Sequence, residues 1–222
     1  MSYADFKSEN LHNHLYLQNY ITVIKNTSSL PIATTILVII NVVVLALGLV
    51  SGAQQEVIRR YGFIPDQLLS VLPSSSDILT RLFASMFIHA NIVHLVFNIL
   101  ALVYLGGYAE RAVGIARYIL VYIIAGIAGA LFYSTISIFI LDNSHTVLIG
   151  ASGAISGILG IAAAAGNTRA YYWLIIQIVF GIIGSFTSIP IAFTAHIGGF
   201  VAAVLLTKVL IIVEQNKRIK NM

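Results

Sequence analysis

Six apolar stretches, five of them about long enough to cross a lipid bilayer as a helix and the second shorter, constrain the fold of this chain more than any other feature. A spanning helix needs about 20 apolar residues to cross a hydrocarbon core about 30 Å thick. Only 9% of the residues are charged and the mean hydropathy is +0.94, whereas about 25% are charged in a soluble domain. The stretches are 31–50, 91–106, 115–140, 147–165, 170–188 and 190–212. We therefore expect an all-α, multi-pass membrane protein.

The polar segments divide the chain into three parts. We expect a polar cytoplasmic tail at 1–30, a six-helix membrane domain at 31–212 and a basic cytoplasmic tail at 213–222. The first tail lacks an apolar segment followed by a small-residue cleavage site, so we expect no removable signal peptide. Pro190 is suited to open the last helix at its first turn.

The distribution of lysine and arginine predicts the orientation of this domain. An even number of spans places both termini on one side, with nine basic residues there against three on the other. By the positive-inside rule, both termini are expected in the cytoplasm. The three exceptions, Arg59, Arg60 and Arg81, lie in a long loop at 51–90, which we expect to be functional or to lie on the membrane surface. No basic stripe with interleaved aromatics occurs, so we expect no nucleic-acid partner.

Polar side chains within the apolar stretches are functional candidates, because burying them in a membrane is costly. The second stretch contains "HANIVHLVFN" with His94 and Asn98, the fourth contains Ser152 and Ser156, and the last contains "FTAHIGGF" with His196. In the predicted topology these three helices enter from the outer side. A rise of 1.5 Å per residue then puts His94, Ser152 and His196 at about 5 to 9 Å below that surface, with Asn98 one turn deeper.

Each of these residues also has a purely structural explanation. A serine in a membrane helix can bond back to its own helix, and a histidine or asparagine can link two helices. Gly153, Gly157 and Gly160 in "GASGAISGILG" are spaced as in small-residue packing faces. The shared depth of one serine, two histidines and one asparagine nevertheless favours a reactive site.

The chemistry available to this set is a serine activated by a histidine. His94, Asn98 and the first-turn N–H of Ser152 could stabilise an oxyanion. The G-x-S-x-G elbow of soluble hydrolases does not fit "GASGA". Cysteine is absent, which excludes a thiolate nucleophile or a cysteine metal site, and we expect no metal and no cofactor. The acidic residues that could assist the pair are expected in loops or at helix ends: Glu56, Asp66, Asp77, Glu110, Asp142 and Glu214.

In their order along the chain, these motifs resemble those of the rhomboid intramembrane serine proteases. The resemblance rests on "HANIVHLVFN", "GASG" and "AHIGG", with "YGFIP" and "LGGYAERAVG" as further landmarks, and extends from about Ile32 to Leu210. It implies a six-helix bundle with a water-filled cavity open to the outer side. It also implies a first loop partly embedded in the outer leaflet and cleavage of substrate transmembrane segments near their outer ends.

The resemblance assigns roles to individual residues. It implies that Ser152 is the nucleophile, that His196 is the general base and later acid, and that His94 and Asn98 bind the oxyanion. Gly199 would let the last helix approach the fourth closely. Gly150, Gly153 and Gly157 are interpreted as packing residues. The expected partners are transmembrane protein substrates and the lipid bilayer, and the expected location is a prokaryotic cell (inner) membrane.

Two positions depart from the family pattern, and two alternative functions remain. The family commonly has Trp-Arg where this chain has Thr80 and Arg81, and an aromatic residue where it has Ser156. One alternative is a catalytically inactive rhomboid-like protein that binds membrane helices without cutting them. The other is a small transporter with His94, Asn98 and His196 as an ion relay, which would typically show interrupted or repeated helices.

Overall fold

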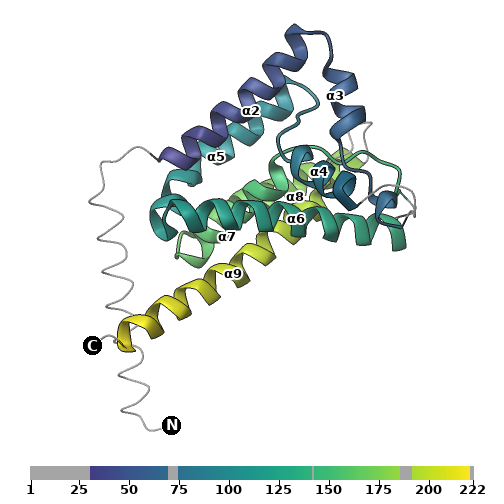
Figure 1. The fold of residues 1–222 in the computed structure, drawn as a ribbon. Helices are drawn as coiled ribbons and strands as arrows, with labels where there is room; N and C mark the ends of the chain where they lie inside the picture. The colour runs from purple at the N-terminus through teal and green to yellow at the C-terminus, as the bar shows by residue number, and fades with distance from the viewer. Residues whose placement is uncertain (1–30, 70–74, 142, 186–191, 221–222) are drawn as a thin grey trace.

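The computed structural model describes residues 31–69, 75–141, 143–185 and 192–220, which fold into helices joined by short connections (Figure 1). The all-α class predicted from the sequence is confirmed for these residues. The tail at 1–30 and Pro190 lie outside them. The elements are α2 (Ile32–Val50), α3 (Gln54–Tyr61), the 3-10 helix η1 (Pro65–Leu68), α4 (Ser75–Ser85), α5 (Ile92–Val113), α6 (Ile115–Phe139), α7 (Ser152–Ala164), α8 (Arg169–Ser185) and α9 (Phe193–Lys220).

Each of the six apolar stretches overlaps one helix of this set. Four of these helices are long and apolar enough to cross a membrane: α2, α5, α6 and, over Phe193–Glu214, α9. The other two, α7 and α8, have 13 and 17 residues. At 1.5 Å per residue, α7 is about 20 Å long, which is shorter than the hydrocarbon core. The structure thus supports a membrane-spanning bundle, while a count of six complete spans stays a prediction.

Helix α7 forms the centre of the bundle. It packs against α5, α6, α8 and α9, and every residue from Gly153 to Ala163 is buried. Glycine and alanine make this possible because their small side chains let neighbouring backbones approach closely. A helix that is apolar on all sides and enclosed by protein need not match the thickness of the bilayer.

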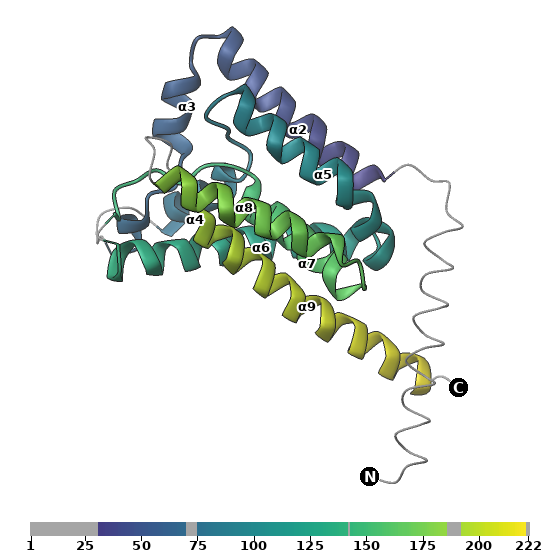
Figure 2. The same ribbon diagram turned by 180° about the vertical axis from the view of Figure 1, so that it is seen from behind.

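The helices around α7 place the loops at two opposite ends. Helices α2 and α5 lie side by side in both views, and α9 crosses below α6 and leads away from the bundle (Figures 1 and 2). At one end, Arg117 near the start of α6 pairs with Glu214 of α9 at 2.7 Å. At the other end, Phe63 of the long loop pairs with Leu148, just before α7, through backbone hydrogen bonds of 3.1 and 2.7 Å.

Several helix ends differ from the predicted boundaries. Helix α7 begins at Ser152 rather than near 147, because Leu148 is in the extended pairing with Phe63. Helix α9 continues past 212 to Lys220, and the described part of the loop at 51–90 contains α3, η1 and α4.

Helix α5 passes through Gly106 and Gly107, where the predicted stretch ended, and continues to Val113. An added Cβ at Gly106 would lie 2.7 Å from the methyl carbon of Thr34, so this glycine serves the packing of α5 on α2. The extension brings Glu110 inside α5, where it is buried. Glu110 thus lies at a helix end, as expected, but in the last turn of a longer α5 than the apolar stretch predicts.

Candidate active site

Ser152 is the first residue of α7, and the residues before it fix its position. Gly150 has φ +119°, in a region where L side chains are strained, and its N–H donates to the carbonyl oxygen of Ser85 at 2.9 Å. This bond attaches the turn before α7 to the end of α4. Because the first-turn amides of a helix have no partner within the helix, the N–H of Ser152 points out of the end of α7.

His196 comes to Ser152 from the first turn of α9. Its Nε2 lies 2.8 Å from the Oγ of Ser152, a hydrogen-bond distance, and its side chain is buried. When the serine hydroxyl donates to Nε2, the proton of the neutral ring is on Nδ1. No hydrogen-bond partner of Nδ1 is found among the described residues, so within them the two side chains form a pair without an acid.

Gly199 makes the short distance between these two helices possible. An added Cβ at Gly199 would lie 2.2 Å from the carbonyl oxygen of Gly153, closer than any real contact. Gly157 is equally constrained, since its Cβ would lie 2.2 Å from the Cβ of Ala125. Gly153 differs, because its Cβ would come no closer than 3.7 Å, to the carbonyl oxygen of Ala195. Close packing therefore requires glycine at 157 and 199, whereas a methyl group at 153 would make only ordinary contacts.

His94 lies on the other side of the turn before α7. Its backbone N–H donates to the side chain of Asn91, which caps α5, at 2.9 Å. A Cβ added to Gly150 would lie 2.8 Å from the Nε2 of His94 and 3.8 Å from the Oγ of Ser152. Both atoms therefore face the same small space, and the absent side chain of Gly150 leaves it open.

Asn98 lies one turn further along α5, as the sequence predicts from the spacing of the two residues. Its side chain is buried, and its Nδ2 donates to the carbonyl oxygen of His94 at 3.0 Å. The amide nitrogen carries a second hydrogen. The structure thus brings His94, Ser152 and His196 around one point, and holds Asn98 below them through a bond within its own helix.

A small cavity adjoins Ser152. It has a volume of about 20 Å³, enough for one water molecule. Met86 and Ala130 line it together with Gly150 and Ser152. It is much smaller than the water-filled cavity that the resemblance implies.

Ser156 has a partner that the sequence could not indicate. Its hydroxyl donates to the Oε1 of Gln177 on α8 at 2.8 Å, and the side chain of Ser156 is fully buried. A serine in a membrane helix commonly donates to a carbonyl oxygen of its own helix. Ser156 instead donates to a side chain of another helix. At this departure from the family pattern, Ser156 links α7 to α8.

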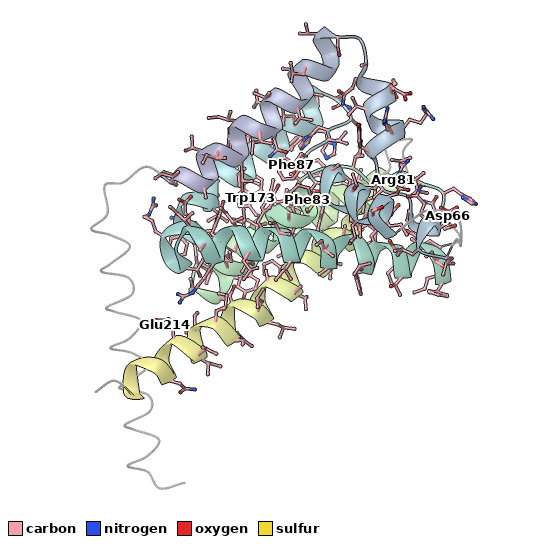
Figure 3. The ribbon with its side chains drawn as sticks, viewed as in Figure 1. Asp66, Arg81, Phe83, Phe87, Trp173 and Glu214 are labelled. Carbon is pink, nitrogen blue, oxygen red and sulfur yellow. The ribbon has the colours of Figure 1, made fainter. Side chains whose placement is uncertain are left out.

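Arg81 anchors the long loop next to Thr80, the other residue that departs from the family pattern. Its Nη1 donates to the carbonyl oxygens of Arg59 and Gly62, at 3.2 and 3.0 Å, at the end of α3. Thr80 instead donates to the carbonyl oxygen of Ser76 within α4, at 2.8 Å. Arg81 and Asp66 lie on the loop side of the bundle, far from Glu214 on α9 (Figure 3). The arginine thus connects α4 to α3 where the tryptophan is missing.

Sequence reasoning missed two buried polar residues. Gln54 at the start of α3 donates from Nε2 to the carbonyl oxygen of His89 at 2.6 Å. Glu110 accepts from the N–H groups of Ala33 and Thr34, at 3.0 and 2.8 Å, and from the hydroxyl of Thr34 at 2.8 Å. Both make contacts more than 30 positions away in sequence, so local periodicity contains no signal for them.

The fold and the site together define a helical membrane protein that holds a serine–histidine pair near one end of its bundle. Residues 76–212 match the model of the Rhomboid domain. This match covers more than half of the chain, which therefore belongs to the rhomboid family, as the sequence motifs predict.

Individual relatives agree with this assignment. The chain is 33% identical over 167 residues to the "Rhomboid protease AarA" of Providencia stuartii, with 62% of this chain and 58% of the relative covered. It is 34% identical over 128 residues to the "Rhomboid protease GluP" of Bacillus subtilis, covering 54% of this chain and 24% of the relative. For "RHOMBOID-like protein 1" of Arabidopsis thaliana the identity is 30%, over 61% of this chain and 35% of the relative. Each alignment spans less than two thirds of the relative.

Proposed function

We propose that this protein is an intramembrane serine endopeptidase that cleaves transmembrane segments of other membrane proteins with a Ser152–His196 dyad. The observation that carries the proposal is the 2.8 Å contact between the Oγ of Ser152 and the Nε2 of His196. The two protease-named bacterial relatives support the same chemistry. The proposed reaction uses only groups of this chain and water.

In the first half of the reaction, the Oγ of Ser152 attacks the carbonyl carbon of the scissile peptide bond. Its proton passes to the Nε2 of His196, which makes the ring cationic. His196 then gives this proton to the nitrogen of the leaving amine, the C–N bond breaks, and an acyl-enzyme ester remains on Ser152.

The negative charge that develops on the substrate oxygen requires donors that are already in place. We assign this role to His94 and Asn98 side chains and to the N–H of Ser152. The space in front of Gly150, which the Nε2 of His94 and the Oγ of Ser152 both face, supports this assignment. Asn98 can act as a donor to the oxyanion when the second N–H of its Nδ2 turns toward Ser152.

In the second half of the reaction, water cleaves the ester. His196 takes a proton from the water, whose oxygen attacks the ester carbon, and the proton returns to the Oγ of Ser152 as the ester bond breaks. The cavity of about 20 Å³ beside Ser152 supports this step, because it has room for one water.

For the arrangement in the membrane, we propose six helices over 31–212, with cytoplasmic tails at 1–30 and 213–222. The loop at 51–90 and the site are then on the outer side of a prokaryotic cell membrane. The positive-inside count supports this orientation. The sequence has no cysteine, so one cysteine introduced at Gln55, or at Asn216 in the proposed cytoplasmic tail, is the only thiol of this protein to be labelled. A membrane-impermeant maleimide should label the first from outside intact cells and not the second, and the reverse pattern would overturn the orientation.

Cleavage of a model transmembrane substrate in liposomes tests the function. Purified protein should cut the substrate, and Ser152→Ala and His196→Ala should each abolish cutting. Ser156→Ala is the matched control, since it removes a hydroxyl from the same helix one turn away and should retain cleavage. Cutting by Ser152→Ala at the rate of the unmodified protein would contradict the mechanism. Binding of the substrate without cutting by the unmodified protein would instead support the inactive helix-binding alternative.

A further inference from the structure

A second buried histidine, His89, lies beside the proposed oxyanion site and has no part in the reaction. His89 lies in the connection between α4 and α5, and its side chain is fully buried. Its ring lies edge-on to the ring of His94, with 5.0 Å between the centroids and 65° between the planes. Burial, followed by the nearby His94, lowers the pKa of His89 to about 3, so its ring is neutral at pH 7.

The side chain of Gln54 is hydrogen-bonded to the backbone of His89. Its Nε2 donates to the carbonyl oxygen of His89 at 2.6 Å, and the side chain is 7% exposed. A Cβ added to Gly48 would lie 1.9 Å from the Oε1 of Gln54, so the glycine leaves the room that this side chain occupies. A buried carbonyl that loses such a donor is left unsatisfied, which makes the attachment costly to break.

The peptide group that Gln54 holds also contacts His94. The carbonyl oxygen of His89 and the N–H of Ala90 belong to one planar peptide unit. That N–H donates to the Nδ1 of His94 at 3.5 Å, a long hydrogen bond. A ring nitrogen that accepts a hydrogen bond carries no proton, so the proton of neutral His94 is on Nε2. The edge of the ring that carries Nε2, together with the neighbouring Cε1, faces the space in front of Gly150.

We propose that Gln54 is a positioning residue, which acts through the His89–Ala90 peptide group to keep the Nε2 of His94 protonated and directed at the oxyanion. This inference rests on the proposed function. Gln54 belongs to the long outer loop and His94 to α5, so the loop contributes directly to the geometry of the site. Because an oxyanion donor acts mainly in the transition state, loss of Gln54 should change kcat much more than KM.

The direct test compares Gln54→Leu with Gln55→Leu in liposomes. Leucine keeps the approximate size of glutamine and removes the donor, and Gln55 is the exposed neighbour on the same helix. We expect Gln54→Leu to lower kcat by about tenfold with KM within about twofold, less than the 10²- to 10³-fold loss typical of deleting an oxyanion donor. Gln55→Leu should leave both within about twofold. An unchanged kcat in Gln54→Leu would overturn the proposal.

A double-mutant cycle separates positioning from a general effect on the fold. In a His94→Ala background, Gln54→Leu should lower the residual kcat by less than about twofold, because the residue through which it acts is gone. A further tenfold loss there would mean that Gln54 acts by another route, and would overturn the proposal. Gly48→Ala, which forces the Gln54 side chain to move, provides a second variant and should repeat the loss of kcat.

The histidine tautomer gives a readout that does not depend on cleavage. Nitrogen NMR of ¹⁵N-histidine-labelled protein distinguishes a protonated Nε2 from a protonated Nδ1. We expect His94 to be protonated at Nε2 in the unmodified protein and in Gln55→Leu, and to shift toward a mixture in Gln54→Leu and Gly48→Ala. Identical His94 signals in all four proteins would overturn this inference. Full cleavage by Ser152→Ala, in contrast, would overturn the proposed function and leave this measurement valid.

Discussion

The hydroxyl of Ser156 on α7 donates a hydrogen bond to the Oε1 of Gln177 on α8, at 2.8 Å. The bond joins the central helix to a neighbour at the position where the resemblance to the family implies an aromatic residue. It leaves Ser152, one turn earlier, as the serine that contacts a histidine. The two serines of the same helix thus have different partners on different helices.

Ser156→Ala should therefore reduce stability without abolishing cleavage. Hydrogen bonds between membrane helices contribute on average about 0.6 kcal/mol, so we expect a loss of about that size. Thermal unfolding in detergent and cleavage in liposomes measure the two effects. Gln177→Leu removes the same bond from the α8 side and should give a similar loss. A complete loss of cleavage in Ser156→Ala alone would show that its hydroxyl serves the reaction.

Gly199→Ala and Gly153→Ala should change stability in opposite directions. A methyl group at 199 would lie 2.2 Å from the carbonyl oxygen of Gly153, so α9 must move, at a cost of about 1–3 kcal/mol. This movement also separates His196 from Ser152, and a displacement of about 1 Å can lower a rate about 10²-fold. A methyl group at 153 makes only ordinary contacts, and alanine favours a helix over glycine by up to about 1 kcal/mol. Thermal unfolding of both variants would contradict this assignment if Gly153→Ala were the less stable.

Gly150→Ala and Gly166→Ala separate backbone strain from contact with the site. Both glycines have positive φ, +119° and +89°, so alanine strains both. Only at 150 would the new Cβ meet His94, at 2.7 Å from Cε1, while nothing lies within 4 Å at 166. We expect both variants to lose stability, and Gly150→Ala also to lose most of its kcat. Equal kcat in the two variants would argue against a reactive space in front of Gly150.

Glu110→Gln should destabilise the contact between α2 and α5. The carboxylate accepts from the first-turn N–H groups of α2 at Ala33 and Thr34, where a negative charge also favours the helix dipole. An amide nitrogen in place of one oxygen faces these donors, and we expect a loss of about 1–3 kcal/mol in thermal unfolding. Glu56→Gln on exposed α3 is the control and should unfold like the unmodified protein. A loss of the same size in both variants would contradict a specific role for Glu110.

The sequence predicts the helices well where apolar length alone decides. Each of the six apolar stretches overlaps a helix, and the depth argument anticipates that His94, Ser152 and His196 come together. The sequence is less informative about helix boundaries that depend on contacts between distant segments. The start of α7 depends on the pairing of Phe63 with Leu148, and Gly106 continues a helix because it packs on Thr34.

The polar residues that contact His89 and Ser156 could not be predicted from the sequence for a related reason. Gln54 lies in a short helix whose residues are mostly polar, so a search for apolar periodicity passes over α3. The bond between Ser156 and Gln177 joins two apolar helices, and either residue alone fits many structures. The orientation of His94 depends on a peptide group held from 35 positions earlier in the chain. Such pairs follow from how the helices pack, which cannot be read from local patterns in a single sequence.

The distance along the chain between Ser152 and His196 has a consequence for the synthesis of the protein. The two residues are 44 positions apart, and His196 is in α9, the final helix of the described chain. A ribosome completes α7 before it has made His196, so a partly inserted chain holds Ser152 without the histidine that contacts it. The dyad is completed only when α9 packs across Gly153 through Gly199. In the proposed mechanism, cleavage therefore requires that α9 has already packed against α7.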